Sequence, residues 1–283
     1  MTARWIDETL HENFRSSYRA SRVLHEERGE HQHLVLFDNP TFGRMLVLDG
    51  AVQTTESDEF IYHEMLAHVP ILAHGRARRV LIVGGGDGGM LEEVLKHRAI
   101  EHVTMVEIDP AVIAFSKRHL TTICRDAFED PRAHVVIADG ARYVADTAER
   151  FDVAIIDSTD PIGPGAVLFT EDFYRGCHRV LNPGGILVTQ NGVPFLQADE
   201  LVGSIRAFRH IFRDAACYTA TVPTYTGGPM AFGWASDDAG VRAHGIDTLR
   251  QRYAAAAVET RYYTPEVHAA AFALPRYIAQ LIR

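Results

Sequence analysis

The sequence predicts an α/β protein with a doubly wound, mostly parallel sheet and a small N-terminal β domain. Three observations lead to this prediction. Short apolar strands alternate with helical patterns from residue 79 to about residue 212, and the connections between them are short. The chain ahead of residue 57 is rich in short β-type runs separated by turn residues. A length of 283 residues suits one large domain plus a small one. We therefore expect domains of residues 1–57 and 58–283.

The N-terminal segment is expected to form a meander of hairpins. Its turns fall at Gly29-Glu30, Asp38–Pro40 and Asp49-Gly50. So small a piece cannot bury enough apolar surface to stand alone, and it should pack on the main domain or on a partner subunit. Edge strands pairing between subunits predict a homodimer or homotetramer. The candidate strands cover residues 23–26, 33–37, 44–48 and 51–55.

The second domain opens with a helix predicted over Asp58–Pro70, followed by a break at Gly75. An α/β succession follows. A closing hairpin is expected to add an antiparallel edge to the parallel sheet. The predicted parallel strands end near residues 83, 107, 138, 156 and 190, and the hairpin strands lie near 216–222 and 230–235. The predicted helices start at Gly89 and Pro110 or lie around 141–144, 171–181 and 201–212, with Asn182–Gly185 closing the fourth.

Composition and charge exclude several classes of protein. The net charge of −9 argues against nucleic-acid binding and favours a cationic substrate. No apolar run reaches the length of a membrane span, and the first residues contain no apolar signal core. The three cysteines are widely spaced and are interpreted as reduced thiols of a cytoplasmic protein. The 15 histidines are scattered without HExxH or CxxC spacing, so no metal site is expected.

A glycine-rich loop, Gly84–Gly89, joins the first parallel strand to its helix. Glycines let the backbone approach a ligand, and the helix N-terminus offers free N–H groups. Glu107 ends the next strand, roughly 20 residues after the loop, where a nucleoside-binding unit places a carboxylate for the ribose hydroxyls. Asp87 lies inside the loop, where it would repel a phosphate or a ligand carboxylate and attract a cation.

Four successive strands end at or near an acid, namely Asp87, Glu107, Asp139 and Asp157, and Asp160 follows closely. A single acid at such a position usually caps the next helix. Four acids at one edge of an open sheet, with no Lys or Arg in the loops that carry Asp87 and Asp160, indicate a crevice for a polycation. Glu107 suits a ribose and Asp139 an adenine amino group, which leaves the other three for positive charge.

Six motifs carry a resemblance to a known family, namely residues 48–55, 58–65, 84–89, 106–109, 157–164 and 223–225. In these motifs the chain resembles the spermidine synthases of the aminopropyltransferase family, and most of all the bacterial members. The resemblance extends over nearly the whole length and implies the Rossmann-like fold of class I methyltransferases. It implies transfer of an aminopropyl group from decarboxylated S-adenosylmethionine to putrescine, giving spermidine and 5′-methylthioadenosine, with no cofactor or metal.

The resemblance also implies roles for individual residues. The expected nucleoside-donor residues are Gln32, Glu107, Asp139, Gly140 and Pro164. The expected amine-binding residues are His63, Asp87, Asp157, Ser158, Thr159 and Asp160, with Asp157 as the proton acceptor, and Gln53, Tyr62 and Tyr225 are expected to line the amine channel. Without the resemblance, the two tyrosines would be interpreted as half-buried core residues and His63 as a surface or capped residue.

Three alternatives stay open. Within the family, the acceptor could be agmatine, cadaverine or spermidine instead of putrescine. A small-molecule methyltransferase would share the sheet and the ribose acid but would use S-adenosylmethionine itself. A polyamine-binding protein without catalytic activity would bind putrescine yet release no methylthioadenosine.

Overall fold

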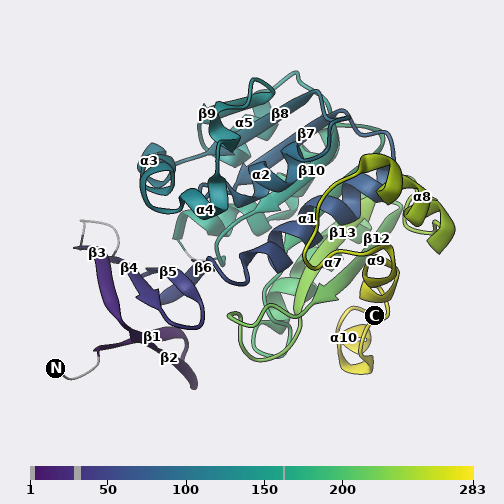
Figure 1. Ribbon diagram of the computed structural model, residues 1–283. Helices are drawn as coiled ribbons and strands as arrows, with labels where there is room; N and C mark the ends of the chain where they lie inside the picture. Colours follow the sequence, from purple (N-terminus) through teal and green to yellow (C-terminus); the bar gives the residue numbers. More distant parts are fainter. Residues whose placement is uncertain (1–3, 29–32, 162) are drawn as a thin grey trace.

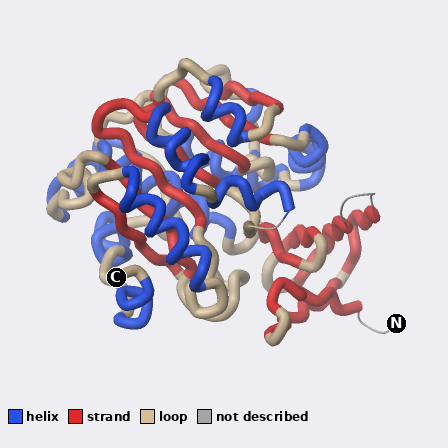
Figure 2. Tube along the Cα trace, turned by 180° about the vertical axis from the view of Figure 1, so that it is seen from behind, coloured by secondary structure: helices blue, strands red, loops and turns tan. Residues whose placement is uncertain are grey.

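A computed structural model describes residues 4–28, 33–161 and 163–283. The chain forms two parts (Figures 1 and 2). The N-terminal strands lie to one side of an α/β part in which helices cover both faces of a central sheet. This arrangement confirms the predicted fold class, a mostly parallel sheet with a small N-terminal β domain.

The N-terminal part contains two antiparallel sheets where one meander was predicted. The predicted strands appear as β3 to β6; β3, β4 and β5 extend beyond the predicted ranges, and β6 matches its range. The turn predicted at Gly29-Glu30 lies outside the described residues. A separate hairpin, β1–β2, precedes them and was not predicted. The strands are β1 (Arg4–His11), β2 (Phe14–Ala20), β3 (Arg22–Arg28), β4 (His33–Asn39), β5 (Gly43–Leu48) and β6 (Ala51–Thr55).

The central sheet has seven strands in the order β12-β13-β11-β10-β7-β8-β9. The five strands from β11 to β9 are parallel, and β13 and β12 add the predicted antiparallel edge. Strands β7 and β10 are neighbours although β8 and β9 separate them in sequence, so the sheet reverses its winding between them. The bounds are β7 (Arg79–Gly84), β8 (His102–Glu107), β9 (Ala133–Ile137), β10 (Phe151–Asp157), β11 (Leu181–Gln190), β12 (Asp214–Ala220) and β13 (Met230–Ser236).

Helices α1 and α2 pack on one face of the sheet and α5, α6 and α7 on the other. Alternation along the strands divides the core accordingly. Val80 and Ile82 of β7 face α1 and α2, whereas Leu81 and Val83 face the opposite layer. The helices are α1 (Glu59–His74), α2 (Gly89–Leu95), α3 (Pro110–His119), α4 (Thr121–Cys124), α5 (Gly140–Asp146), α6 (Glu171–Val180), α7 (Ala198–Ile211), α8 (Ile246–Ala256), α9 (Pro265–Ala271) and α10 (Arg276–Leu281).

Two predictions of local structure were wrong, and three helices were not predicted. Helix α1 continues through Pro70 to His74, and it is buried on nearly all sides because the sheet, α2 and the C-terminal helices surround it. It ends where Gly75, in the left-handed conformation, donates its N–H to the Ile71 carbonyl. Residues 182–185 belong to β11, with an irregular register opposite β10, and do not form a separate turn. Helices α8 to α10 were not predicted.

The two parts are joined next to the start of α1. The buried Asp58 carboxylate accepts hydrogen bonds from the Thr55 hydroxyl at 2.5 Å and from the backbone N–H and hydroxyl of Thr224 at 2.7 and 2.5 Å. Tyr18 of β2 donates to the Thr224 carbonyl at 3.3 Å. Asp58 therefore ties β6, α1 and the loop that carries Tyr225 to one point.

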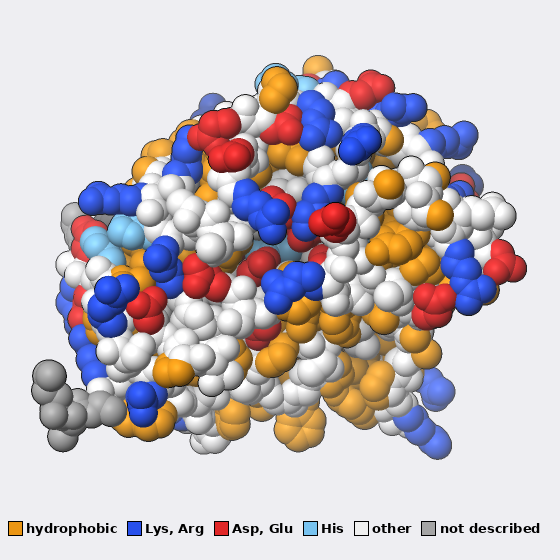
Figure 3. Space-filling model, in the orientation of Figure 1, with side chains coloured by type: hydrophobic (Ala, Val, Ile, Leu, Met, Phe, Trp, Pro, Cys, Tyr) orange, Lys and Arg blue, Asp and Glu red, His pale blue; other side chains and the backbone are white. Residues whose placement is uncertain are grey.

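The surface has no large region of one charge sign on the face seen in Figure 3, where Lys and Arg side chains are interspersed with Asp and Glu. Within the described chain, none of the helices combines the length and the apolarity that crossing a bilayer requires.

Candidate active site

The site lies where the ends of β7 and β10 meet. Asp157, the last residue of β10, pairs in register with Gly84, the last residue of β7. A Cβ atom on Gly84 would lie 2.0 Å from the Asp157 carbonyl oxygen, and Gly84 has φ +87°. Gly85 donates its N–H to the same carbonyl at 3.0 Å. Only glycine allows the loop to come this close, so the glycine-rich sequence places Asp87 beside Asp157.

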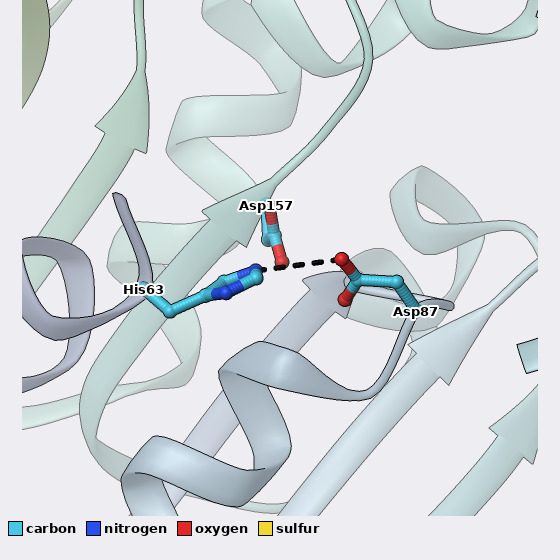
Figure 4. A group of neighbouring side chains, drawn as sticks. All are labelled: His63, Asp87 and Asp157. Atoms are coloured by element: carbon cyan, nitrogen blue, oxygen red, sulfur yellow. Dashed lines mark ion pairs between the residues drawn. The ribbon is translucent and has the colours of Figure 1, made fainter. Parts of the chain in front are cut away.

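Three side chains from different elements converge at this point (Figure 4). His63 projects from α1, Asp87 from the glycine loop and Asp157 from the end of β10, and one ligand atom of each lies within 4.8 Å of the others. His63 Nε2 lies 3.6 Å from Asp87 Oδ2. Asp87 also accepts the Gly89 N–H at 2.9 Å, which fixes its carboxylate in the loop.

His63 is held by a second acid on its own helix. Its Nδ1 atom lies 2.6 Å from Glu59 Oε2, one helical turn away. Burial alone would lower the pKa of His63, but Asp87, Glu59 and Asp157 outweigh it and raise that pKa to about 10. The imidazole is therefore a cation at neutral pH, enclosed by three carboxylates.

Asp157 is the acid of this group whose pKa is clearly shifted by its surroundings. Loss of water around the carboxyl group raises its pKa to about 6, and nearby Asp87 adds to the shift while His63 opposes it. Tyr62 donates its hydroxyl hydrogen to Asp157 Oδ1 at 2.6 Å, which stabilises the carboxylate form. A carboxylate with a raised pKa is a better proton acceptor than one with an ordinary pKa.

Two tyrosines form a wall next to Asp157. The rings of Tyr62 and Tyr225 lie edge to face, with centroids 6.1 Å apart. Burial raises the pKa of both phenols well above the usual range, so both are neutral donors. Tyr225 donates to the Gln53 backbone carbonyl at 2.7 Å, whereas the Gln53 amide donates to the Ala51 carbonyl at 3.2 Å within its own strand, β6. Gln53 thus contributes its backbone to this wall.

Glu107 lies at the end of β8 against the glycine loop. Its Oε1 atom accepts the Asp109 N–H at 3.0 Å, and a Cβ atom on Gly86 would lie 2.9 Å from its Oε2 atom. Burial raises the pKa of this carboxyl group. Glu107 is thus held against the glycine loop at the end of β8.

Asp139 has a structural role at the start of α5. It caps α5 by accepting the Arg142 N–H at 2.9 Å, and it does not belong to the group formed by His63, Asp87 and Asp157. Gly140 packs on β7, since a Cβ atom there would lie 2.4 Å from Val83 Cγ1. The structure therefore does not bring all four strand-end acids together.

The loop after β10 carries the remaining predicted residues. The Ser158 hydroxyl is buried and has no hydrogen-bond partner among the described residues, and the Thr159 hydroxyl faces its own loop. Asp160 Oδ1 accepts a hydrogen bond from Gln197 at 2.6 Å. Pro164 lies in a 3₁₀ turn, Gly163–Phe169, but its side chain is not described, and Gln32 lies outside the described residues.

Two groups of residues at the site were not predicted. Glu59, the partner of His63, could have been found from its spacing of four residues on a helix. Gln197 and Glu200, which adjoin Asp160, are about 40 residues away in sequence and have no local signal. Within the described chain, no Lys or Arg lies within ion-pair distance of Asp87, Glu107, Asp157 or Asp160.

The arrangement suits a bound cation. One imidazole and two carboxylates are ligands that a divalent metal ion accepts once the imidazole has lost its proton, whereas the two carboxylates attract an organic ammonium even while His63 is protonated. Because a nucleoside-type loop and two neutral phenols adjoin it, the surroundings favour an organic cation.

Comparison with known protein families covers almost the whole chain. The Spermine/spermidine synthase domain matches residues 59–244, and the Spermidine synthase tetramerisation domain matches residues 4–56. The chain is 58% identical over 277 residues to a polyamine aminopropyltransferase of Ruegeria sp., covering 98% of each protein. It is 56% identical to the polyamine aminopropyltransferase of Pseudomonas syringae, covering 97% of this chain and 96% of the relative.

Solved structures show the same similarity. A spermidine synthase in complex with the transition state analogue AdoDATO superimposes with a TM-score of 0.93 at 36% identity, covering 99% of this chain and 96% of the other. The spermidine synthase of Thermotoga maritima superimposes with a TM-score of 0.90 at 35% identity, covering 99% and 95%.

Proposed function

This chain belongs to the spermine/spermidine synthase family, and on that basis we propose that it is a spermidine synthase. It transfers the aminopropyl group of decarboxylated S-adenosylmethionine to putrescine and releases spermidine and 5′-methylthioadenosine. The observation that carries this proposal is the group of His63, Asp87 and Asp157 at the junction of β7 and β10. The relatives' names support aminopropyl transfer, and the acceptor is part of the proposal.

Asp87 selects the donor by charge. Decarboxylated S-adenosylmethionine carries an ammonium at the end of its aminopropyl chain, whereas S-adenosylmethionine carries a carboxylate beside the same ammonium. Asp87 is fixed in the glycine loop and has no Lys or Arg within ion-pair distance in the described chain. Asp87 attracts the ammonium that both compounds carry and repels the carboxylate that only S-adenosylmethionine carries, so the repulsion distinguishes the two. Glu107, Asp139, Gly140, Gln32 and Pro164 are assigned to the rest of the donor nucleoside.

The reaction is a direct displacement. The unprotonated acceptor nitrogen attacks the carbon next to the sulfonium, the new C–N bond forms as the C–S bond breaks, and the sulfur retains the electron pair as a neutral thioether. An alkyl amine titrates near the lysine value of about 10.4, so the acceptor must lose a proton before it attacks. Asp157 accepts this proton, a role that its raised pKa suits, and later releases it to solvent, while the alkylated nitrogen leaves as a secondary ammonium.

The acceptor lies along the wall made by Tyr62, Tyr225 and the Gln53 backbone. Neutral phenols and a carbonyl suit the methylene chain of a diamine and its N–H groups. Ser158, Thr159 and Asp160 complete this side, with Asp160 facing the positive charge of the acceptor. No metal ion or other cofactor takes part in the step.

The N-terminal part is assigned to subunit contact, because it matches a tetramerisation domain and its hairpin exposes Trp5 (58%). We expect a homodimer or homotetramer by sedimentation at micromolar concentration, and a monomer would contradict this assignment. The cytoplasmic location expected from the sequence stays a prediction.

The test is a mass-spectrometric assay with decarboxylated S-adenosylmethionine and a panel of putrescine, agmatine, cadaverine and spermidine. We expect stoichiometric spermidine and methylthioadenosine, with putrescine the best acceptor, and the same rate in excess EDTA. A higher kcat/KM with another amine would show that this amine, and not putrescine, is the preferred acceptor. Methyl transfer from S-adenosylmethionine, or amine binding without methylthioadenosine release, would contradict the proposal.

A further inference from the structure

The side-chain amide of Gln197 bridges two carboxyl groups at the edge of the site. Its Nε2 atom donates to Asp160 Oδ1 at 2.6 Å and to Glu200 Oε1 at 2.9 Å. Gln197 stands immediately before α7, whereas Asp160 lies in the loop after β10. In the described part of the loop from Ser158 to Gly165, this is the one side-chain hydrogen bond to another element. The amide therefore determines where Asp160 lies.

The orientation of the Gln197 amide follows from its partners. The Oε1 atom accepts the Val193 backbone N–H at 3.0 Å, and both hydrogens on Nε2 point at carboxyl oxygens. Rotating the amide by half a turn would place its oxygen against two carboxyl groups and its NH₂ against another N–H donor. Glu200 thus secures the direction in which Gln197 donates to Asp160.

The backbone that supports Gln197 is itself anchored. The Asn191 amide accepts from the Thr189 hydroxyl at 2.6 Å and donates to the Ser204 hydroxyl at 2.8 Å, and Gln190 accepts the Gly192 N–H at 2.7 Å. Gly192 has φ +61°, and a Cβ atom there would lie 2.6 Å from Gln197 Oε1. The turn after β11 is therefore packed directly against the amide, which leaves it little freedom to move.

The two carboxyl groups lie in a setting that is poor in compensating charge. Burial raises the pKa of Glu200 to about 7, with the negative charge of Asp160 adding to the effect, and burial also raises the pKa of Asp160. Tyr174 of α6 lies near Glu200, and Glu8 and His11 of β1 lie near Asp160. The Glu200 Oε2 atom is buried without a hydrogen-bond partner among the described residues. A cation beside Asp160 would relieve this excess of negative charge.

We propose that Gln197 is a positioning residue for the acceptor amine: held in direction by Glu200, it fixes one oxygen of Asp160 and leaves the other to the distal ammonium of the acceptor. This inference rests on the proposed function and adds to it a residue that acts through Asp160. It predicts an effect on the acceptor alone, because Gln197 makes no hydrogen bond to Asp87, Glu107 or Asp157 in the described structure.

The experiment measures kcat, donor KM and acceptor KM for the full-length enzyme and three variants, with putrescine as acceptor. Gln197→Ala removes the amide group that donates a hydrogen bond to Asp160. Gln197→Glu keeps the size but replaces an N–H donor with a third carboxyl group. Asp199→Asn is the matched control, since it removes an exposed charge from the first turn of α7 without contacting Asp160.

We expect the acceptor KM to rise about tenfold in Gln197→Ala and at least as much in Gln197→Glu, with donor KM and kcat within about twofold of wild type. Asp199→Asn should match wild type. A role in packing alone would leave Gln197→Glu near wild type, and that result overturns the inference, as does an equal change in both KM values. Wild-type enzyme without transferase activity overturns the proposed function as well, whereas active wild type with unaffected Gln197 variants overturns this inference alone.

Discussion

Tyr62 and Asp157 are joined by a 2.6 Å hydrogen bond between a phenol on α1 and a carboxylate at the end of β10. The two residues are 95 positions apart in sequence. Burial raises the pKa of the Tyr62 phenol, so the phenol keeps its hydrogen. By donating that hydrogen to Asp157, the phenol stabilises the carboxylate form and lowers the pKa of Asp157. The bond therefore sets how readily Asp157 accepts a proton.

Replacing Tyr62 with Phe should move the acidic limb of the kcat profile to higher pH. Tyr62 lowers the pKa of Asp157 by stabilising the carboxylate, so its removal raises that pKa further above about 6 and fewer molecules are deprotonated at a given pH. The measurement is kcat from pH 5 to pH 9 at saturating substrates. An acidic limb that stays in place would show that the bond does not govern the titration of Asp157.

Asp157→Asn should lose most of its turnover but should still bind decarboxylated S-adenosylmethionine. A positioned proton acceptor contributes roughly 10²–10⁴-fold to rate, so we expect a fall in kcat within that range. The donor Kd, measured by calorimetry, should change by less than about threefold because Asp87 and Glu107 remain. Near wild-type turnover would remove Asp157 from the proton-transfer step.

Because His63 is protonated in the folded protein, the stability of the fold should fall as the pH rises into the alkaline range. Its folded pKa of about 10 lies above its ordinary value of 6.5. A group with a raised folded pKa stabilises the fold fully below the ordinary value and loses that contribution as pH rises towards 10. The temperature of thermal unfolding should therefore decline from pH 7 to pH 10 more steeply in wild type than in His63→Gln. Parallel declines would show that His63 is not protonated in the folded enzyme.

Asp58→Ala should weaken both stability and acceptor binding. The change leaves the buried N–H and hydroxyl of Thr224 without their acceptor, which costs about 2 kcal/mol in the free energy of unfolding. Tyr225, the next residue, should lose its fixed place against Tyr62, so we expect the acceptor KM to rise more than the donor KM. Denaturant unfolding and steady-state kinetics test the two effects separately, and an unchanged acceptor KM would contradict the link to Tyr225.

Much of the fold follows from the sequence because the strand and helix periods repeat regularly between residues 79 and 236. The exceptions have physical causes. Helix α1 lacks one apolar stripe because nearly every side of it is covered, so its pattern does not show where it ends. Pro70 lies inside it, and Gly75 is the true terminus.

Site residues could be predicted from the sequence only where they lie at or just after the end of a predicted strand. Asp87, Glu107 and Asp157 each follow an apolar strand, and adjacent parallel strands bring their ends together. Asp139 shows the limit of this argument, since the same pattern also describes a helix cap. The contact between Gln197 and Asp160 depends on how two loops pack, and no periodicity in the sequence encodes it.

The central claim is that Asp87, beside His63 and Asp157, favours a nucleoside that bears an ammonium without a neighbouring carboxylate. It is tested most directly by calorimetric titration of wild type and Asp87→Asn with decarboxylated S-adenosylmethionine and with S-adenosylmethionine. Wild type should bind the decarboxylated form at least tenfold more tightly, and Asp87→Asn should reduce that preference severalfold. Equal affinity of wild type for the two compounds, or a preference for the carboxylated one, would contradict the account.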